Sequence, residues 1–308
     1  MRKPLAAAFF ALAIAGAGAA PATAAEAAPQ GLGKVADAGS VTSAASGVIT
    51  SVEQTLSGLT GSSAKAVDFA GTVALSNCSG SVVRMPDSED NDPALVMTNG
   101  HCLDGGMPAP GEVRVDQTSS RTFGLLNASG SRVATLRAAK LAYGTMTDTD
   151  VAFYQLTTTY AQIKNSYGIN ALTLNDTHPV AGTAISIPSG YWKRIYSCDI
   201  DGFAHNLKEG DWTFKDSVRY TSACNTIGGT SGSPVVDEAT GKVVAINNTG
   251  NEDGARCTVN NPCEVDANGE VTVRKGINYA QQTYQVPACF GADSKLDLSA
   301  SGCTLPKP

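Results

Sequence analysis

Three side chains with complementary chemistry occur along the chain in the order histidine, aspartate, serine. Ser231 lies between Gly229 and Gly232, in a glycine-rich turn that would present its hydroxyl group ahead of a short apolar stretch. His101 follows an apolar run that predicts a strand, and Asp150 precedes another. A serine hydroxyl is a weak nucleophile, so it needs a base that a third group orients, and histidine suits this role with its ordinary pKa of about 6.5. The three residues together predict nucleophilic acyl transfer.

The chain holds two other histidines, and neither is a better candidate for the base. His178 precedes a proline and His205 lies in a polar stretch, so both are interpreted as loop residues. All three histidines precede Ser231, which excludes the serine, aspartate, histidine order of α/β-hydrolases. In addition, Ser233 stands where the Gly-x-Ser-x-Gly motif of that fold requires its second glycine. Competing candidates are Asp148 for the aspartate, and Thr230 and Ser233 for the nucleophile.

The segments around these residues resemble the signatures of a known family. His101-Cys102 after its strand, Asp150-Val151-Ala152, and Gly229-Thr230-Ser231-Gly232-Ser233-Pro234 are similar to those of chymotrypsin-fold, trypsin-like serine endopeptidases. The similarity is strongest to the secreted bacterial branch, which includes glutamyl and lysyl endopeptidases. It spans roughly residues 66 to 290.

This resemblance implies a role for each residue. His101 is expected to be the general base, Asp150 rather than Asp148 to orient it, and Ser231 to be the nucleophile. The backbone N–H groups of Gly229 and Ser231 are expected to form the oxyanion hole. No metal or organic cofactor is expected, and the partners are protein or peptide substrates of a monomer.

The residues expected to set substrate specificity differ from those of the best-known members of the family. By resemblance, the primary specificity pocket includes polar, uncharged residues, namely Asn225, Thr226, Asn247, Asn248 and Thr249. Trypsin-like members carry an aspartate where Asn225 stands, and glutamyl endopeptidases carry a histidine where Asn247 or Asn248 stands. An acid could still enter from the long loop 250–275, which contains Glu252, Asp253 and Glu264. The preferred substrate residue therefore stays open.

A second departure lies next to the nucleophile. Thr230 occupies the place where animal digestive enzymes carry an aspartate that pairs with a newly cut N-terminus. Activation by insertion of a new N-terminus therefore has no charged partner.

The composition and the resemblance together predict the fold. Short strands separated by turns, with 32 glycines in 308 residues, favour a sandwich or a barrel. The resemblance implies an all-β fold of two packed six-stranded antiparallel barrels, chymotrypsin-like, with a C-terminal helix into which residues 276–282 lead. Expected boundaries are 66–165 and 166–290 for the two barrels and 291–308 for a disulfide-tethered tail. Strands are expected at 69–75, 80–83, 94–98, 111–115, 122–126, 133–136 and 151–156, then at 184–187, 191–196, 212–214, 218–220, 235–236, 243–246 and 271–273.

The eight cysteines are even in number and include no Cys-x-x-Cys pair, which favours disulfides over a metal site. By the resemblance, Cys78 pairs with Cys102 and closes the loop that carries His101. Proximity in the sequence suggests three further pairs, namely Cys198 with Cys224, Cys257 with Cys263, and Cys289 with Cys303.

The N-terminus predicts export. A basic start, an apolar run from 5 to 20 and small residues at 22–24 are typical of a signal peptide over residues 1–25, so the mature protein is expected to be secreted without a membrane span. Residues 26–65 are Ala-, Gly- and Ser-rich, with apolar residues at helical spacing between 41 and 59. They are interpreted as a propeptide or as an N-terminal arm.

The net charge of the chain argues against nucleic acid as a partner. The net charge of −6 and the pI near 5.1 leave no basic surface for nucleic acid. The acidic turn at 86–93 lacks the ligand spacing of a calcium loop and is expected to be a solvated hairpin tip.

Two alternatives to a peptidase remain at this point. One is a catalytically silent homologue that acts as an extracellular binding protein, against which the complete set of three residues argues. The other is an exported esterase on another fold, against which the residue order argues.

Overall fold

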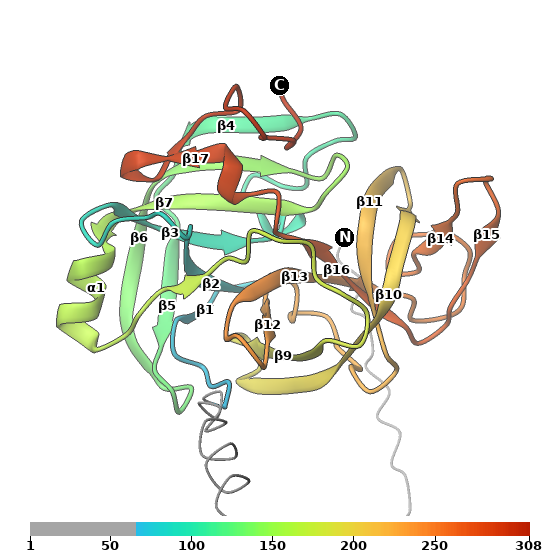
Figure 1. The fold of residues 1–308 in the computed structure, drawn as a ribbon, viewed down its shortest axis with the longest axis horizontal. Helices are drawn as coiled ribbons and strands as arrows, with labels where there is room; N and C mark the ends of the chain where they lie inside the picture. Colours follow the sequence, from blue (N-terminus) through green and yellow to red (C-terminus); the bar gives the residue numbers. More distant parts are fainter. Residues whose placement is uncertain (1–65) are drawn as a thin grey trace, which may run out of the picture. The chain divides into compact units, whose positions relative to one another are not determined.

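The computed structural model describes residues 66–308, which belong to the compact unit Gly61–Pro308. The predicted signal peptide, the predicted propeptide or arm and its predicted helix lie outside the described residues. Strands dominate the described part of the chain (Figure 1). None of its helices has the length and apolar character needed to cross a membrane.

Six strands close the first sheet into a barrel. They pair in the order β1-β5-β6-β7-β3-β2, and β1 also pairs with β2, which completes the ring; β4 joins β6, and β8 runs parallel to β2. The strands of this sheet are β1 (Thr72–Ala74), β2 (Ser79–Arg84), β3 (Pro93–Thr98), β4 (Val113–Thr118), β5 (Thr122–Leu126), β6 (Arg132–Thr145), β7 (Val151–Thr159) and β8 (Leu172–Thr173).

Strand β7 shows why its sequence is continuously apolar instead of alternating. Tyr154 and Leu156 point into the barrel interior, whereas Val151 and Phe153 point outward and pack against other parts of the domain. Because both faces of the strand are covered, the residues that point inward and those that point outward are both buried. Asp150 lies immediately before this strand and is 1% exposed.

The second sheet also has eight strands. Its order is β11-β16-β13-β12-β9-β10-β14-β15, and β10 pairs with β11 as well. The strands are β9 (Ala184–Ser189), β10 (Arg194–Glu209), β11 (Trp212–Tyr220), β12 (Pro234–Asp237), β13 (Val243–Gly250), β14 (Cys263–Val265), β15 (Val271–Thr272) and β16 (Asn278–Gln282). His205, expected in a loop, is an exposed residue of β10, whereas His178 does lie in a loop.

The C-terminal helix expected after residues 276–282 is not formed among the described residues. Residues 278–282 themselves form strand β16, because they are held between β11 and β13 and their side chains are mostly buried. The one α-helix among residues 66–308 is α1 (Tyr160–Tyr167), which a capping box at Thr159 begins and Gly168 ends. After β16 the chain makes only 3-10 turns and the two-residue strands of a small sheet. These are η2 (Pro287–Cys289), β17 (Phe290–Gly291), η3 (Ala292–Ser294) and β18 (Lys295–Leu296).

The C-terminal segment packs against the first barrel. Cys289 and Leu305 belong to the same buried cluster as Tyr143 and Phe153, and the Tyr143 hydroxyl donates to the carbonyl oxygen of Pro306 over 3.0 Å. The segment therefore covers the outer face of β6 and β7.

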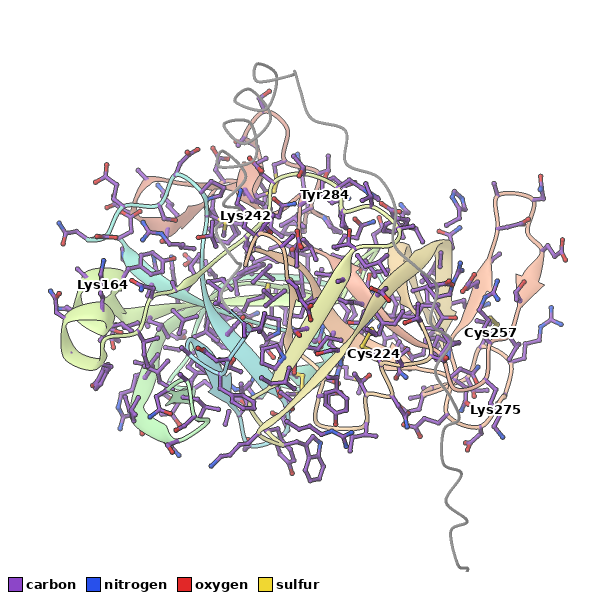
Figure 2. The ribbon with its side chains drawn as sticks, turned by 60° about the horizontal axis from the view of Figure 1, so that its bottom comes forward. Lys164, Cys224, Lys242, Cys257, Lys275 and Tyr284 are labelled. Atoms are coloured by element: carbon purple, nitrogen blue, oxygen red, sulfur yellow. A yellow bond between two sulfur atoms is a disulfide. The ribbon has the colours of Figure 1, made fainter. Side chains whose placement is uncertain are left out.

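Four disulfides join the cysteines in the pairs given above. They are Cys78–Cys102, Cys198–Cys224, Cys257–Cys263 and Cys289–Cys303. Figure 2 labels Cys224, which lies in the connection between β11 and β12, and Cys257, which precedes β14. Between 66 and 308 no cysteine is free.

Candidate active site

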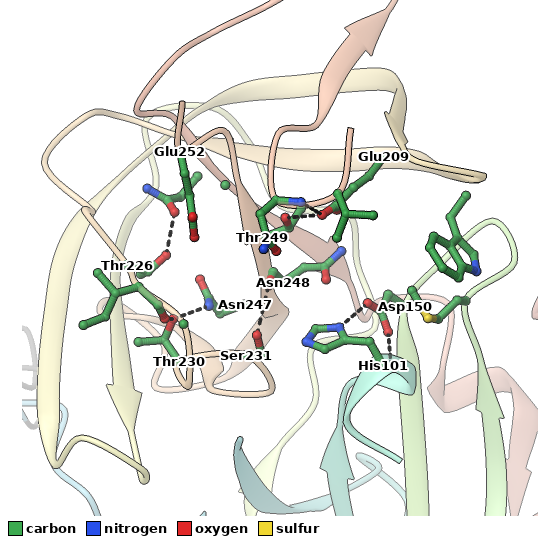
Figure 3. A pocket seen from close by; sticks show the side chains of 18 of the residues that line it. His101, Asp150, Glu209, Thr226, Thr230, Ser231, Asn247, Asn248, Thr249 and Glu252 are labelled. Carbon is green, nitrogen blue, oxygen red and sulfur yellow. Dashed lines mark hydrogen bonds and ion pairs between the residues drawn. The ribbon is translucent and has the colours of Figure 1, made fainter. Parts of the chain in front are cut away.

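One pocket collects side chains from both sheets. His101 and Asp150 enter from the first sheet and Ser231 from the second, and all three line a pocket that opens to solvent (Figure 3). The structure therefore brings the three predicted residues together although the sequence separates them widely.

The pairing of β3 with β7 sets histidine beside aspartate. Thr98 lies opposite Ala152, so the 3-10 turn η1 (Gly100–Cys102) that follows β3 meets the residue that precedes β7. His101 Nδ1 lies 2.6 Å from Asp150 Oδ2, and the His101 backbone N–H donates to Asp150 Oδ1 over 3.1 Å. The carboxylate thus fixes both the ring and the main chain of the histidine.

Buried contacts hold the turn that carries the histidine. The Cys78–Cys102 disulfide fixes its end, and Arg121 Nη1 donates to the Cys102 carbonyl oxygen over 2.6 Å. Arg121 is itself bound to Asp104 and its side chain is 4% exposed. Such satisfied buried contacts restrict the orientation of His101 to a narrow range.

The environment of His101 raises its pKa. Burial of the ring lowers the pKa, but the charge of Asp150, the hydrogen bond to Asp150 and the charge of Glu209 raise it, and the net pKa is above the ordinary value of 6.5. A neutral ring takes up a proton readily when a neighbouring carboxylate stabilises the imidazolium that forms.

The turn that carries Ser231 is tied into both sheets. The backbone N–H of Ser79 in β2 donates to the Ser231 carbonyl oxygen over 2.8 Å, and the N–H of Gly232 donates to the Asn247 carbonyl oxygen over 2.9 Å. The Ser231 hydroxyl donates to the carbonyl oxygen of Asn248 over 3.3 Å. Figure 3 shows the imidazole of His101 turned toward Ser231.

Two neighbours orient the peptides before the serine. Gly229 has φ of +90°, which favours glycine, and a Cβ there would meet Trp192 Nε1 at 3.0 Å. The Trp192 indole donates to the Gly228 carbonyl oxygen over 2.8 Å, and the Ser79 hydroxyl donates to the Gly229 carbonyl oxygen over 3.0 Å. Within residues 66–308, the amide N–H groups of Gly229 and Ser231 donate to no protein acceptor.

Thr230 is held by neutral groups only. It is 2% exposed, its hydroxyl donates to the Ile227 carbonyl oxygen over 2.5 Å, and it accepts from Asn247 Nδ2 over 3.0 Å. These bonds occupy the position where the animal digestive enzymes have an ion pair.

Four of the five residues expected in the specificity pocket line it, namely Thr226, Asn247, Asn248 and Thr249. Asn225 does not. Its side chain is exposed to solvent, and its backbone N–H donates to the Ala223 carbonyl oxygen across Cys224. Thr226 instead donates to Asn278 Oδ1 over 2.9 Å.

The acids of the loop 250–275 have different positions. Glu252 lines the pocket, whereas Asp253 does not. Glu264 is paired with Arg219 and Arg274 elsewhere on the second sheet.

The sequence did not point to two further residues near His101, Asp150 and Ser231. Glu209 lines the pocket from the end of β10, and Trp192 reaches Gly228 from the turn between β9 and β10. Neither residue lies in a motif, and each depends on strand ends that meet only in the folded chain. The only weak signal for Glu209 is an acid before Gly210, which is typical of a hairpin end.

One group of potential metal ligands lies close together. Suitable atoms of Cys78, His101 and Cys102 fall within 4.8 Å of one another, but both sulfur atoms are joined in a disulfide. They are therefore not thiolate ligands.

Comparison with known proteins agrees with this geometry. The family model of the trypsin-like peptidase domain matches residues 78–246, which is more than half of the chain. This match identifies the chain as a serine-type peptidase. The chain belongs to the trypsin-like peptidase domain family.

Several solved structures are similar at a low level. The Rv3671c protease from M. tuberculosis in its active form is 15% identical with a TM-score of 0.44, over 78% of this chain and 85% of that chain. The MamO protease domain from Magnetospirillum magneticum is 13% identical with a TM-score of 0.43, over 70% of this chain and 92% of that chain. Chymotrypsin of Cellulomonas bogoriensis is 12% identical with a TM-score of 0.38, over 70% and 90%. Likenesses this low support no argument about function, and no curated protein sequence matches the chain.

Proposed function

We propose that this peptidase is a secreted serine endopeptidase that cleaves protein or peptide substrates through His101, Asp150 and Ser231. The observation that carries the proposal is the 2.6 Å contact between His101 Nδ1 and Asp150 Oδ2, in a pocket where the imidazole faces Ser231. This contact leaves Nε2 of the ring toward the serine, which is the arrangement that general-base catalysis needs.

In the first half of the reaction, Ser231 Oγ leaves its hydrogen bond with Asn248 and attacks the carbonyl carbon of the scissile peptide. His101 takes the hydroxyl proton and Asp150 stabilises the imidazolium. When the tetrahedral intermediate collapses, the C–N bond breaks and His101 gives the proton to the leaving amine. The acyl group stays on Ser231 as an ester.

The N–H groups of Gly229 and Ser231 stabilise the negative oxygen of the intermediate. They are unengaged by protein acceptors within the described residues, and the neighbouring carbonyl groups are held by Trp192 and Ser79. One donor of this kind contributes about 3 to 4 kcal/mol to the transition state. A water molecule then attacks the ester, with His101 again as the base, and releases the acid.

The proposal extends to the organisation of the chain. The ring of pairings in the second sheet supports a second barrel, with the pocket between the two barrels. All groups needed for the reaction come from one chain, which supports action as a monomer. Four disulfides fit an oxidising compartment, in line with a signal peptide over residues 1–25 and a propeptide or arm over 26–65.

The test is to incubate the purified protein, without residues 1–25, with casein and with a serine-reactive fluorophosphonate. We expect casein cleavage and a covalent label on Ser231, with both lost in Ser231→Ala and strongly reduced in His101→Ala. A folded protein that shows neither cleavage nor labelling would indicate the silent binding homologue. Turnover of esters without cleavage of peptides would indicate an esterase.

A further inference from the structure

The candidate active site is an acidic pocket. Besides Asp150, which binds His101, two carboxylates line it, those of Glu209 and Glu252. Figure 3 shows Glu252 on the side of Thr226 and Glu209 on the side of Asp150, with Ser231 between them. The residues that line the pocket include no lysine or arginine. A substrate thus meets two carboxylates beyond the catalytic aspartate.

Neither carboxylate is neutralised by the protein. Among residues 66–308, Glu209 and Glu252 take part in no ion pair, and the Glu252 carboxylate accepts no hydrogen bond. Glu209 is 9% exposed, and both of its hydrogen bonds go to Oε1, so Oε2 has no protein donor. Glu252 is exposed, whereas Glu209 is buried, and this burial raises the pKa of the Glu209 carboxyl. A carboxylate without a cationic partner attracts a cation from outside the chain.

The loop that carries Glu252 has a defined conformation. Asn251 is 1% exposed, and its Nδ2 donates to the carbonyl oxygens of Ala255 and Pro262, over 3.0 and 2.9 Å. The Glu252 backbone N–H donates to the Asn260 carbonyl oxygen over 3.0 Å. These bonds hold Glu252 against the far side of its own loop.

Two further restraints fix the loop on the second sheet. The Cys257–Cys263 disulfide closes its outer part. Glu209 Oε1 accepts from the Asn260 N–H over 2.7 Å and from the Thr249 hydroxyl over 3.0 Å. Glu209 thus fastens the loop to the pocket wall, and the exposed Glu252 lies on this fastened loop where it lines the pocket.

No other charged side chain lines this side of the pocket, which also includes the apolar Ile227 next to Thr226. Thr226, Asn247 and Asn278 line it, while the exposed Asn225 does not reach it. The negative charge on this side therefore comes from Glu252. A long cationic side chain could keep its apolar stem among these residues and place its charged end beside the carboxylate.

We propose that Glu252 is the specificity-determining residue of this peptidase and selects lysine or arginine at the position whose carbonyl carbon Ser231 attacks. This inference rests on the proposed function. It assigns the selective acid to the loop after β13, not to the segment before the serine.

The first test compares peptide anilides that are identical except for Lys, Arg, Gln or Leu at that position. We expect the wild-type protein to prefer Lys and Arg over Gln by at least about tenfold in kcat/KM. In Glu252→Gln, the ratio of Lys to Gln is expected to fall by at least about tenfold. Asp253→Asn is the matched control, because it removes the same charge one residue further on but outside the pocket, and it should keep the wild-type ratio.

A second test measures binding without turnover. Benzamidine, a cation, and benzamide, its neutral analogue, are titrated into the Ser231→Ala protein and into the same protein with Glu252→Gln. We expect benzamidine to bind more tightly than benzamide, and Glu252→Gln to abolish most of this difference.

The outcomes separate the two proposals. If Gln and Leu peptides are cleaved as well as Lys peptides, or if Glu252→Gln and Asp253→Asn have equal effects, the role of Glu252 is refuted while the peptidase function stands. If no peptide is cleaved but benzamidine binding depends on Glu252, the cation site is supported and the proposed function fails.

Discussion

The indole N–H of Trp192 donates to the carbonyl oxygen of Gly228 over 2.8 Å. The carbonyl of Gly228 and the N–H of Gly229 belong to one planar peptide and point in opposite directions. A side chain on the turn between β9 and β10 therefore sets the direction of one donor of the proposed oxyanion hole. Trp192 is a positioning residue in this arrangement, since it acts through the peptide and not on the substrate.

Loss of the Trp192 indole N–H should lower kcat more than it changes KM. Trp192→Phe keeps an aromatic ring but loses the N–H, so the peptide is less restricted. We expect kcat to fall by roughly 3- to 10-fold, about 1 kcal/mol, with a smaller change in KM. Tyr191→Phe is the control, because it alters the adjacent aromatic residue without touching the Gly228 bond. An equal loss in both variants, or a change confined to KM, would contradict the positioning role.

The activity of the free enzyme should depend on the protonation of His101. Because its pKa is raised above the ordinary value, kcat/KM should rise with pH through a midpoint above about 6.5. Glu209→Gln removes a negative charge that raises this pKa, while the amide oxygen can still accept both hydrogen bonds. The midpoint should therefore move to lower pH. It should stay in place in Glu270→Gln, a change at an exposed residue outside the pocket.

Gly232 should tolerate no side chain. It has φ of +82°, and a Cβ there would overlap the carbonyl oxygen of Ser79 and the hydroxyl oxygen of Thr98. Gly241 has φ of +70°, but no described atom lies within 4 Å of a Cβ at that position. Gly241→Ala should therefore cost only about 1 kcal/mol of unfolding free energy for the backbone conformation. Gly232→Ala should cost clearly more in urea denaturation, and equal losses would show that the overlap is relieved easily.

The C-terminal disulfide should matter for stability and not for catalysis. Cys289 and Cys303 close a loop with a sequence separation of 14 and lie away from the pocket. Replacing both by alanine should lower the unfolding free energy by about 3 kcal/mol, which corresponds to a decrease in Tm of roughly 6 to 12 °C. kcat/KM at 25 °C should stay within about twofold of wild type. A large loss of activity in a protein that is still folded would show that the tail supports the site.

The three residues of the candidate active site could be located in the sequence because each lies in a local pattern. His101 follows an apolar strand, Asp150 precedes one, and Ser231 lies in a glycine turn, so each has a recognisable neighbourhood. The strand 122–126 was predicted with the bounds that the structure has, since its turns are marked on both sides. In these cases, short-range sequence and long-range packing favour the same structure.

The remaining features depend on contacts that no local pattern encodes. Glu209 acts at the pocket only because β10 extends through 16 residues, well beyond the strand expected at 191–196. Residues 278–282 lack a strong strand pattern, and their pairing with β11 and β13 decides their conformation. Glu252 was visible as an acid in a long loop, but its direction follows from Asn251, Asn260 and a disulfide.

The neutral bonds of Thr230 bear on how such a peptidase is kept latent. The hydroxyl is bound on both sides by groups of its own domain, Ile227 and Asn247, so the shape of the nucleophile turn does not wait for a liberated amino group. A new N-terminus released by cleavage would therefore find no carboxylate to pair with at this turn, and the turn keeps its shape through bonds between neutral groups.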